Sequence, residues 1–188
     1  MGDRSGPPFE RVALAGHSGD GVIAELTAVS FHRVDALIVT GWADGGAHPF
    51  VPRAFTRMRQ RCVTAPGSKR PGGAGGWAFL FTRRELEMLV HDVDPQVLEA
   101  FIAVYEQDPC GWFGDSETAL TANIARAPTV DVPVLLVSGE HDAVAPPPAV
   151  ELQRARYELG RDDVTCLMVA GTGHQIMFER RAPVCVLA

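Results

Sequence analysis

Four short hydrophobic runs recur along the chain, and each would be apolar on both faces of an extended strand. They cover residues 11–15, 36–40, 132–137 and 164–169. Runs of this length and pattern are typical of strands inside a parallel sheet, where both faces are covered. The pattern therefore predicts four buried parallel strands with polar turns between them and the elements that follow.

Helical signals follow these runs. Val22, Leu26 and Val29 share one face of a predicted helix that comes directly after the first run. This helix joins the first two strands into a β-α-β unit, whose crossover is expected to be right-handed. Prolines 146–148 predict the start of a second helix, and a last helix is expected from about Gln175. We expect helices on both faces of the sheet.

Residues 45–131 interrupt this alternation of strands and helices. Asp94 followed by a proline predicts the start of a helix, and Ser116 predicts the cap of another. No further parallel strand is indicated in the segment. We therefore expect a mainly helical insertion, which divides the core into residues 9–44 and 132–188.

Composition narrows the class of protein. The 188 residues are 46% hydrophobic and 21% charged, which fits one globular domain with an insertion. The net charge of -6 argues against a nucleic-acid binder. No apolar run reaches the roughly 20 residues that span a bilayer, and the start lacks the apolar stretch of a secretory signal, so we expect a cytoplasmic protein.

The four cysteines are scattered, with no C-x-x-C pair among them. This spacing does not indicate a zinc site, and in a chain without a secretory signal a disulfide framework is not expected. We expect buried free thiols instead, and neither a metal nor an organic cofactor. The cysteines are Cys62, Cys110, Cys166 and Cys185.

Three polar residues stand where predicted strands end. Ser18 follows the first strand, Asp142 the third and His174 the fourth. The carboxyl ends of parallel strands meet at one edge of a sheet, so these side chains are expected to converge there. A serine nucleophile, an imidazole base and a carboxylate that orients the imidazole form an acyl-transfer triad. Asp44, after the second strand, is a reserve candidate for the acid.

The segment Gly16-His17-Ser18-Gly19-Asp20, between a strand and a helix, resembles the nucleophile elbow of the α/β-hydrolase superfamily. The chain order Ser, Asp, His matches that superfamily, and the insertion resembles its cap domain. The resemblance implies that Ser18 is the nucleophile, that Asp142 and His174 complete the triad, and that the Gly19 N–H belongs to the oxyanion hole. It also implies that His17 packs beneath the nucleophile.

The sequence departs from the superfamily pattern in two ways. The elbow usually reads G-x-S-x-G, and here Asp20 holds the last position. Only about ten residues precede the first predicted strand, so the chain resembles the carboxyl-terminal two-thirds of the fold, without the loop that supplies a second oxyanion donor. We expect an unpaired edge on the first strand, which a second copy or a complementing amino-terminal fragment could cover.

The expected activity is hydrolysis of an ester-like acyl bond in a small-molecule substrate, through an acyl-enzyme on Ser18. The alternative is an inactive or incomplete remnant of the fold that acts as a binding or assembly module. The aromatic residues of the insertion could line an apolar acyl pocket or form the insertion's own core, and both readings stay open. They include Phe79, Phe81, Trp112 and Phe113.

Overall fold

The computed structural model describes residues 9–64 and 76–182, except for the side chains of residues 112–116. Its main sheet has four parallel strands in the order β1-β2-β5-β6. The strands are β1 (Ala13–His17), β2 (Ala36–Thr40), β5 (Val134–Gly139) and β6 (Val164–Val169). The four predicted parallel strands are therefore confirmed, with the first shifted two residues toward the carboxyl end.

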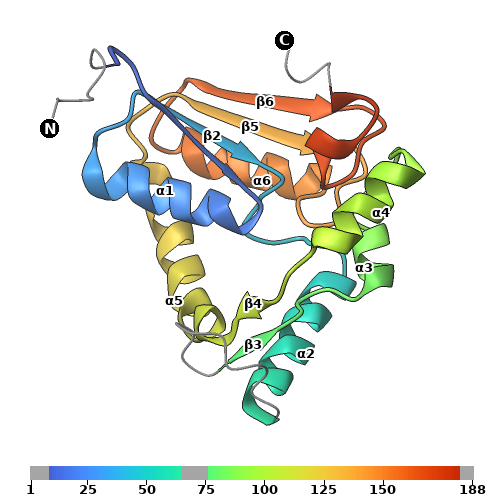
Figure 1. Cartoon of the computed structure of the whole chain (residues 1–188). Coiled ribbons are helices and arrows are strands. Elements are labelled where there is room, and N and C mark those ends of the chain that lie inside the picture. Colours follow the sequence, from blue (N-terminus) through green and yellow to red (C-terminus); the bar gives the residue numbers. More distant parts are fainter. Residues whose placement is uncertain (1–8, 65–75, 183–188) are drawn as a thin grey trace, which may run out of the picture.

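The long helices that pack on the sheet lie on one of its faces, contrary to the expectation of helices on both (Figure 1). They are α1 (Gly19–Phe31) and α6 (Pro147–Glu158), and α5 (Cys110–Arg126) packs against α1. The strand order explains the difference, because the chain moves across the sheet in a single direction from β1 to β6. Right-handed crossovers that all step the same way place their helices on the same face.

The core lies between the sheet and this helical layer. Leu37 and Val39 of β2 and Leu136 of β5 are almost completely buried there. Small residues of the helices pack against them, which allows the helices to approach the sheet closely. The helical side of this core is formed by Ala24, Ala28, Ala149, Val150 and Tyr157.

Strand β1 is more exposed than its sequence predicts. Ala13 and Ala15 are exposed, and in the described part of the chain β1 pairs only with β2. An outermost strand lacks a neighbour on one side, so an apolar run is not by itself evidence of burial. The position of β1 agrees with the unpaired edge expected for it.

Residues 45–131 connect β2 to β5 and are called the insertion from here on. The insertion is mainly helical, and its α3 and α4 lie beyond the carboxyl ends of β5 and β6 (Figure 1). Its two short strands pair antiparallel. Besides α5, its elements are α2 (Phe50–Thr64), β3 (Trp77–Ala78), α3 (Arg83–Glu87), α4 (Pro95–Val104) and β4 (Asp108–Pro109).

Within the insertion, local capping chemistry explains where α4 begins but not where α5 begins. The Asp94 side chain accepts a hydrogen bond from Gln96 N–H, and Pro95 opens α4, as predicted. Ser116 was expected to cap a helix, but it lies inside α5, which begins at Cys110. The helix begins earlier, at the residue that directly follows β4.

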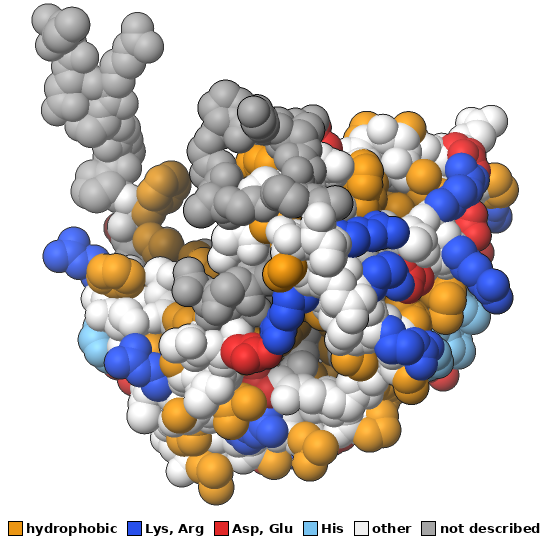
Figure 2. Space-filling view, turned by 90° about the horizontal axis from the view of Figure 1, so that it is seen from below, with side chains coloured by type: hydrophobic (Ala, Val, Ile, Leu, Met, Phe, Trp, Pro, Cys, Tyr) orange, Lys and Arg blue, Asp and Glu red, His pale blue; other side chains and the backbone are white. Residues whose placement is uncertain are grey.

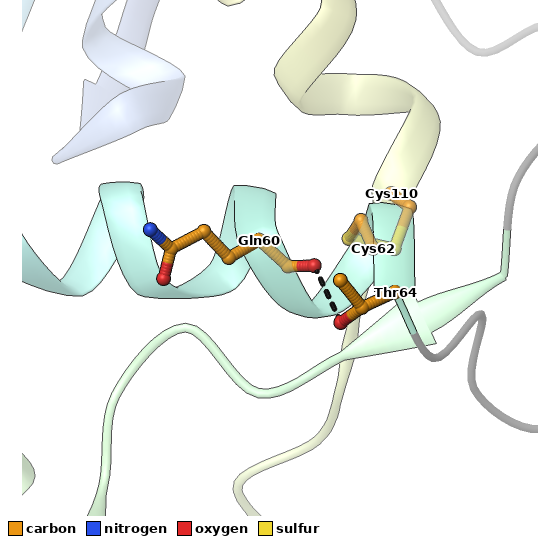
Figure 3. Close-up of a disulfide and its surroundings, with 4 residues drawn as sticks. All are labelled: Gln60, Cys62, Thr64 and Cys110. Carbon is orange, nitrogen blue, oxygen red and sulfur yellow. Dashed lines mark hydrogen bonds between the residues drawn. A yellow bond between two sulfur atoms is a disulfide. The ribbon is translucent and has the colours of Figure 1, made fainter.

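A disulfide joins Cys62 to Cys110, contrary to the expectation of free thiols (Figure 3). The two Cα atoms are 5.6 Å apart, a normal separation for a disulfide. The bond links the end of α2 to the start of α5 beside a small apolar cluster of Ala54, Met58, Ala78 and Leu80. Spacing could not reveal it, because 48 residues separate the two cysteines and only folding brings them together. Cys166 is free, and Cys185 lies outside the described residues.

The last predicted helix is reduced to a single turn. Between Gln175 and Arg181, within the described part of the chain, the 3-10 turn η2 (Ile176–Phe178) forms where a helix is expected. The chain leaves the helical conformation at Glu179, which forms an antiparallel bridge with Val93 of the insertion. Tertiary pairing therefore overrides the local helical signal. A second 3-10 turn, η1 (Ala127–Thr129), follows α5.

The surface carries charges of both signs. On the face shown in Figure 2, basic and acidic side chains lie among hydrophobic ones. Some of the charges form ion pairs between elements, such as Arg59 of α2 with Glu117 of α5. Within residues 9–64 and 76–182, no helix combines the length and the apolar character needed to cross a membrane.

Candidate active site

Ser18 occupies a strained turn between β1 and α1. Its φ of 55° and ψ of -130° are unusual for a residue other than glycine. The turn is held by Ser18 N–H, which donates to Thr40 O at 2.8 Å, and by Gly21 N–H, which donates to Ser18 O at 2.9 Å. The strain therefore persists because both backbone groups of Ser18 are tied to neighbouring elements.

In this turn, the backbone of Gly16 lies very close to the backbone of Asp20. A Cβ atom at Gly16 would lie 2.3 Å from the carbonyl oxygen of Asp20, so only glycine fits. The Asp20 side chain is exposed. An aspartate is accommodated at the last elbow position because its carbonyl, rather than its side chain, faces the strand.

His174 connects Ser18 to Asp142. Its Nε2 lies 3.0 Å from Ser18 Oγ, and its Nδ1 lies 3.1 Å from each carboxylate oxygen of Asp142. The carboxylate can only accept, so Nδ1–H donates to Asp142 and Nε2 is free to accept from the serine hydroxyl. The structure thus brings together the three residues that the sequence places at separate strand ends.

Asp142 is buried and held in its ionised form. Burial by itself would raise its pKa, but hydrogen bonds from His174 and from the amides of Val144 and Ala145 hold that pKa below its ordinary value. The two amides donate to Oδ1 at 2.7 and 2.9 Å. A charged, oriented carboxylate therefore faces the imidazole.

His17 packs against the ring of His174, whereas the resemblance implies packing beneath the nucleophile. The two ring centroids are 4.7 Å apart, and His17 Nδ1 lies 2.9 Å from Thr40 Oγ1. Burial, together with the nearby charge of a protonated His174, lowers the pKa of His17 to about 4. His17 is therefore neutral at physiological pH and adds no competing charge beside His174.

Gly41 makes room for both histidine rings. Its φ is +60°, and a Cβ atom there would lie 2.9 Å from His17 Cε1 and from His174 Nδ1. A side chain at this position would have to displace the imidazole. The turn after β2 thus helps to shape the site although it contributes no polar side chain.

Asp44, the reserve acid, is engaged elsewhere. Its buried carboxylate accepts from Trp42 Nε1 at 3.2 Å, from Asn123 Nδ2 at 3.0 Å and from Arg156 at 3.0 Å. Among the described residues, no contact joins Asp44 to His174. Of the two carboxylates considered, Asp142 alone contacts the imidazole.

The Gly19 N–H lies at the start of α1. The first amides of a helix have no acceptor in a preceding turn, and the helix dipole favours negative charge near them. Gly19 is the first residue of α1 and directly follows Ser18. The arrangement offers one backbone donor beside the serine hydroxyl.

Two buried glutamates escaped sequence analysis. Glu25 of α1 accepts a hydrogen bond from the Tyr157 hydroxyl, and burial raises its pKa to about 8. Glu25 lies on the same face of α1 as Val22 and Val29, and this spacing could have predicted its burial. Glu179 is also buried, and it accepts from the amides of Gly173, six residues before it, and of Asp92, 87 residues before it. The partner in the insertion left no local signal in the sequence.

The aromatic residues of the insertion do not form one group. Phe81 packs into the apolar clusters of the insertion, whereas Phe79 is 41% exposed. Phe79 borders an open cavity of about 570 Å³ together with Val104 and Tyr105, and no triad residue lines that cavity. The side chains of Trp112 and Phe113 lie outside the described residues.

No group of three or more potential ligands that could hold a metal ion occurs in the part of the chain that the structure describes. Around Ser18 the structure places the imidazole of His174, the carboxylate of Asp142 and the backbone amide of Gly19.

Comparisons with known proteins give a structural likeness without a sequence match. No model of a protein family matches the chain, and no curated protein matches it. Solved structures do match. They include a monoacylglycerol lipase of Paleococcus ferrophilus, with 17% identity, a TM-score of 0.65, and coverage of 91% of this chain and 63% of the lipase.

Two further structures agree with this likeness. A thermophilic esterase from Thermogutta terrifontis is 20% identical with a TM-score of 0.64, covering 93% of this chain and 61% of the esterase. An enol-lactonase from Burkholderia xenovorans is 18% identical with a TM-score of 0.66, covering 93% of this chain and 62% of the lactonase. The chain spans less than two thirds of the length of each of these proteins. Its strand order, its serine turn and these matches show that the protein has the α/β-hydrolase fold.

Proposed function

We propose that the protein is a serine hydrolase that cleaves an ester-like acyl bond. The observation that carries the proposal is the continuous hydrogen-bonded chain from Ser18 Oγ through His174 to Asp142, with separations of 3.0 and 3.1 Å. The fold is shared with proteins named as a lipase, an esterase and a lactonase, which supports a hydrolase of this class.

The first half of the proposed reaction forms an acyl-enzyme. His174 Nε2 takes the proton of the Ser18 hydroxyl as its oxygen attacks the carbonyl carbon, and a tetrahedral intermediate with a negatively charged oxygen results. When this intermediate collapses, the bond to the leaving alcohol breaks and His174 returns the proton to that alcohol. The acyl group then remains on Ser18.

The second half releases the acid. Water replaces the alcohol, His174 Nε2 removes one of its protons, and the hydroxide oxygen attacks the acyl carbon. Collapse of the second intermediate breaks the bond to Ser18 Oγ, which recovers its proton from His174. Asp142 supports both halves because its negative charge stabilises the protonated imidazole and holds its tautomer.

Charge development on the substrate oxygen needs hydrogen-bond donors. The Gly19 N–H, at the positive end of α1, is the proposed donor. Loss of one donor of this kind costs about 2.7–4 kcal/mol of transition-state stabilisation in a well-studied protease. A single donor would therefore sustain a slow reaction, and a second donor would accelerate it.

The test is labelling with a fluorophosphonate probe, followed by mass mapping of the modified peptide. We expect covalent modification at Ser18 and its loss in Ser18→Ala. Ser30→Ala is the matched control, because Ser30 lies on the same helix but is exposed and bonded to Arg126. Turnover of a short-chain aryl ester should follow the same pattern in the three proteins.

Two outcomes would contradict the proposal. Well-folded protein that takes up no probe would favour the alternative, a remnant of the fold that works as a binding or assembly module. Equal labelling of the wild type and Ser18→Ala would place the reactive group elsewhere. Circular dichroism on each variant establishes that the protein compared is folded.

A further inference from the structure

The loop that carries His174 is hydrogen-bonded to the insertion. The backbone N–H groups of His174 and Gln175 both donate to the carbonyl oxygen of Leu89, at 2.8 and 3.2 Å. Arg180 N–H donates to Asp92 O at 2.9 Å, just beyond η2. Leu89 and Asp92 belong to the connection between α3 and α4. The backbone of His174 is therefore fixed by a segment that lies more than 80 residues before it in the sequence.

A single buried carboxylate joins the same two segments. Glu179 is 3% exposed, and it accepts from Gly173 N–H at 2.8 Å through Oε1 and from Asp92 N–H at 3.0 Å through Oε2. Hydrogen bonds to an ionised carboxylate are stronger than those between neutral groups. Oε1 of Glu179 thus binds the loop that carries His174, and Oε2 binds the insertion.

The insertion also supports the loop that carries Asp142. His48 N–H donates to Ala143 O at 2.7 Å. Val144 is buried among Phe50, Leu86 and Leu89 of the insertion. The insertion consequently contacts the segments next to both partners of Ser18, and it is packed onto them through apolar side chains as well as backbone hydrogen bonds.

We propose that Glu179 is a positioning residue, which holds His174 within reach of Ser18 by tying its loop to the insertion. The role of His174 rests on the proposed function. Glu179 itself would not touch substrate. Its effect would arise because a hydrogen-bonded relay tolerates little displacement, and a shift of about 1 Å at a reacting group can cost about 100-fold in rate.

Glu179→Gln is the informative substitution. The glutamine oxygen can accept from one of the two amides, but its NH₂ group would face the other amide and leave that buried donor unpaired. We expect kcat for the aryl ester to fall about 100-fold with little change in KM, because substrate binding does not involve the residue. The rate of probe labelling at Ser18 should fall in parallel.

Glu140→Gln is the matched control. Glu140 Oε2 accepts from Gly171 N–H at 2.9 Å, so it too is a carboxylate bound to an amide of the His174 loop. It is exposed, however, and no described contact joins it to the insertion. We expect its kcat to stay within about two-fold of the wild type, since a solvated amide is readily satisfied by water. Equal losses in Glu179→Gln and Glu140→Gln would overturn the proposal.

A measurement that does not require catalysis tests the positioning role of Glu179 independently of the proposed function. The Nδ1 proton that His174 donates to Asp142 should give a downfield proton resonance, which should shift or broaden in Glu179→Gln and persist in Glu140→Gln. An unchanged resonance would overturn the positioning role, even if Ser18 proved unreactive. If wild-type Ser18 is unreactive while the resonance responds as expected, the proposed function fails and the positioning role stands.

Hydrogen exchange on the wild type covers the case in which Glu179→Gln does not fold. The amides of Asp92 and Gly173 should be protected, and they should exchange together when the junction between the His174 loop and the insertion opens. Fast exchange of either amide, at the rate of an open loop, would overturn the proposal.

Discussion

Removing the disulfide between Cys62 and Cys110 should destabilise the protein by a large part of its total stability. The bond closes a loop across 48 residues of sequence separation, for which the chain-entropy relation gives about 4 kcal/mol at 25 °C. A typical domain has only about 5–15 kcal/mol of unfolding free energy. The double substitution Cys62→Ala with Cys110→Ala should therefore lower the urea midpoint markedly.

Urea unfolding of the oxidised wild type, the reduced wild type and the double variant measures this effect. Reductant should bring the wild type close to the double variant and leave the double variant unchanged. Peptide mapping after alkylation of unfolded, unreduced protein should find Cys166 modified and Cys62 and Cys110 protected. A double variant as stable as the oxidised wild type, or alkylation of Cys62 and Cys110 without reductant, would refute the reasoning.

Two further substitutions test the electrostatics. Because burial raises the pKa of Glu25 from 4.5 to about 8, the native state keeps a proton that the unfolded state loses above 4.5. The free energy of unfolding should therefore fall by up to about 1.4 kcal/mol per pH unit between pH 4.5 and about 8. Glu25→Gln should remove this decline. If urea unfolding gave the same pH dependence for the wild type and Glu25→Gln across that range, the reasoning would be wrong. Asp142→Asn removes the charge that stabilises protonated His174, so kcat for the aryl ester should fall by up to about 10⁴-fold, as the same change does in a serine protease. A variant that keeps its fold and loses less than about 10-fold in kcat would count against Asp142 as the acid.

The disulfide also bears on where the protein works. Disulfides persist mainly in oxidising compartments, whereas a cytoplasmic location was expected from the sequence. The location stays a prediction, and the bond between Cys62 and Cys110 counts against it.

Features with short-range causes could be predicted from the sequence. Asp94 caps α4 because its oxygen reaches an amide only two residues away. The helix after Ser18 follows from the spacing of apolar residues along α1. The meeting of Ser18, Asp142 and His174 at one edge was predictable for a different reason, because parallel strands all end on the same side of a sheet.

Features that depend on distant pairing could not be predicted in this way. The side of the sheet that carries the helices follows from the strand order, which no local pattern contains. Residues after Gln175 have a helical pattern, yet Glu179 leaves the helix to bind Asp92 and Gly173. In that case hydrogen bonds from one buried and one half-buried amide outweigh local helix propensity.

The amino-acid sequence by itself determined the four parallel strands, the starts of α1, α4 and α6 and the edge at which three polar side chains meet. These features depend on hydrophobic periodicity and on neighbours a few residues apart. Tertiary structure alone decided the pairing of Cys62 with Cys110, the burial of Glu25 against Tyr157 and the attachment of the His174 loop to the insertion. Each of these joins residues that are far apart in the chain, and their energies exist only after the core has formed and excluded water from between them.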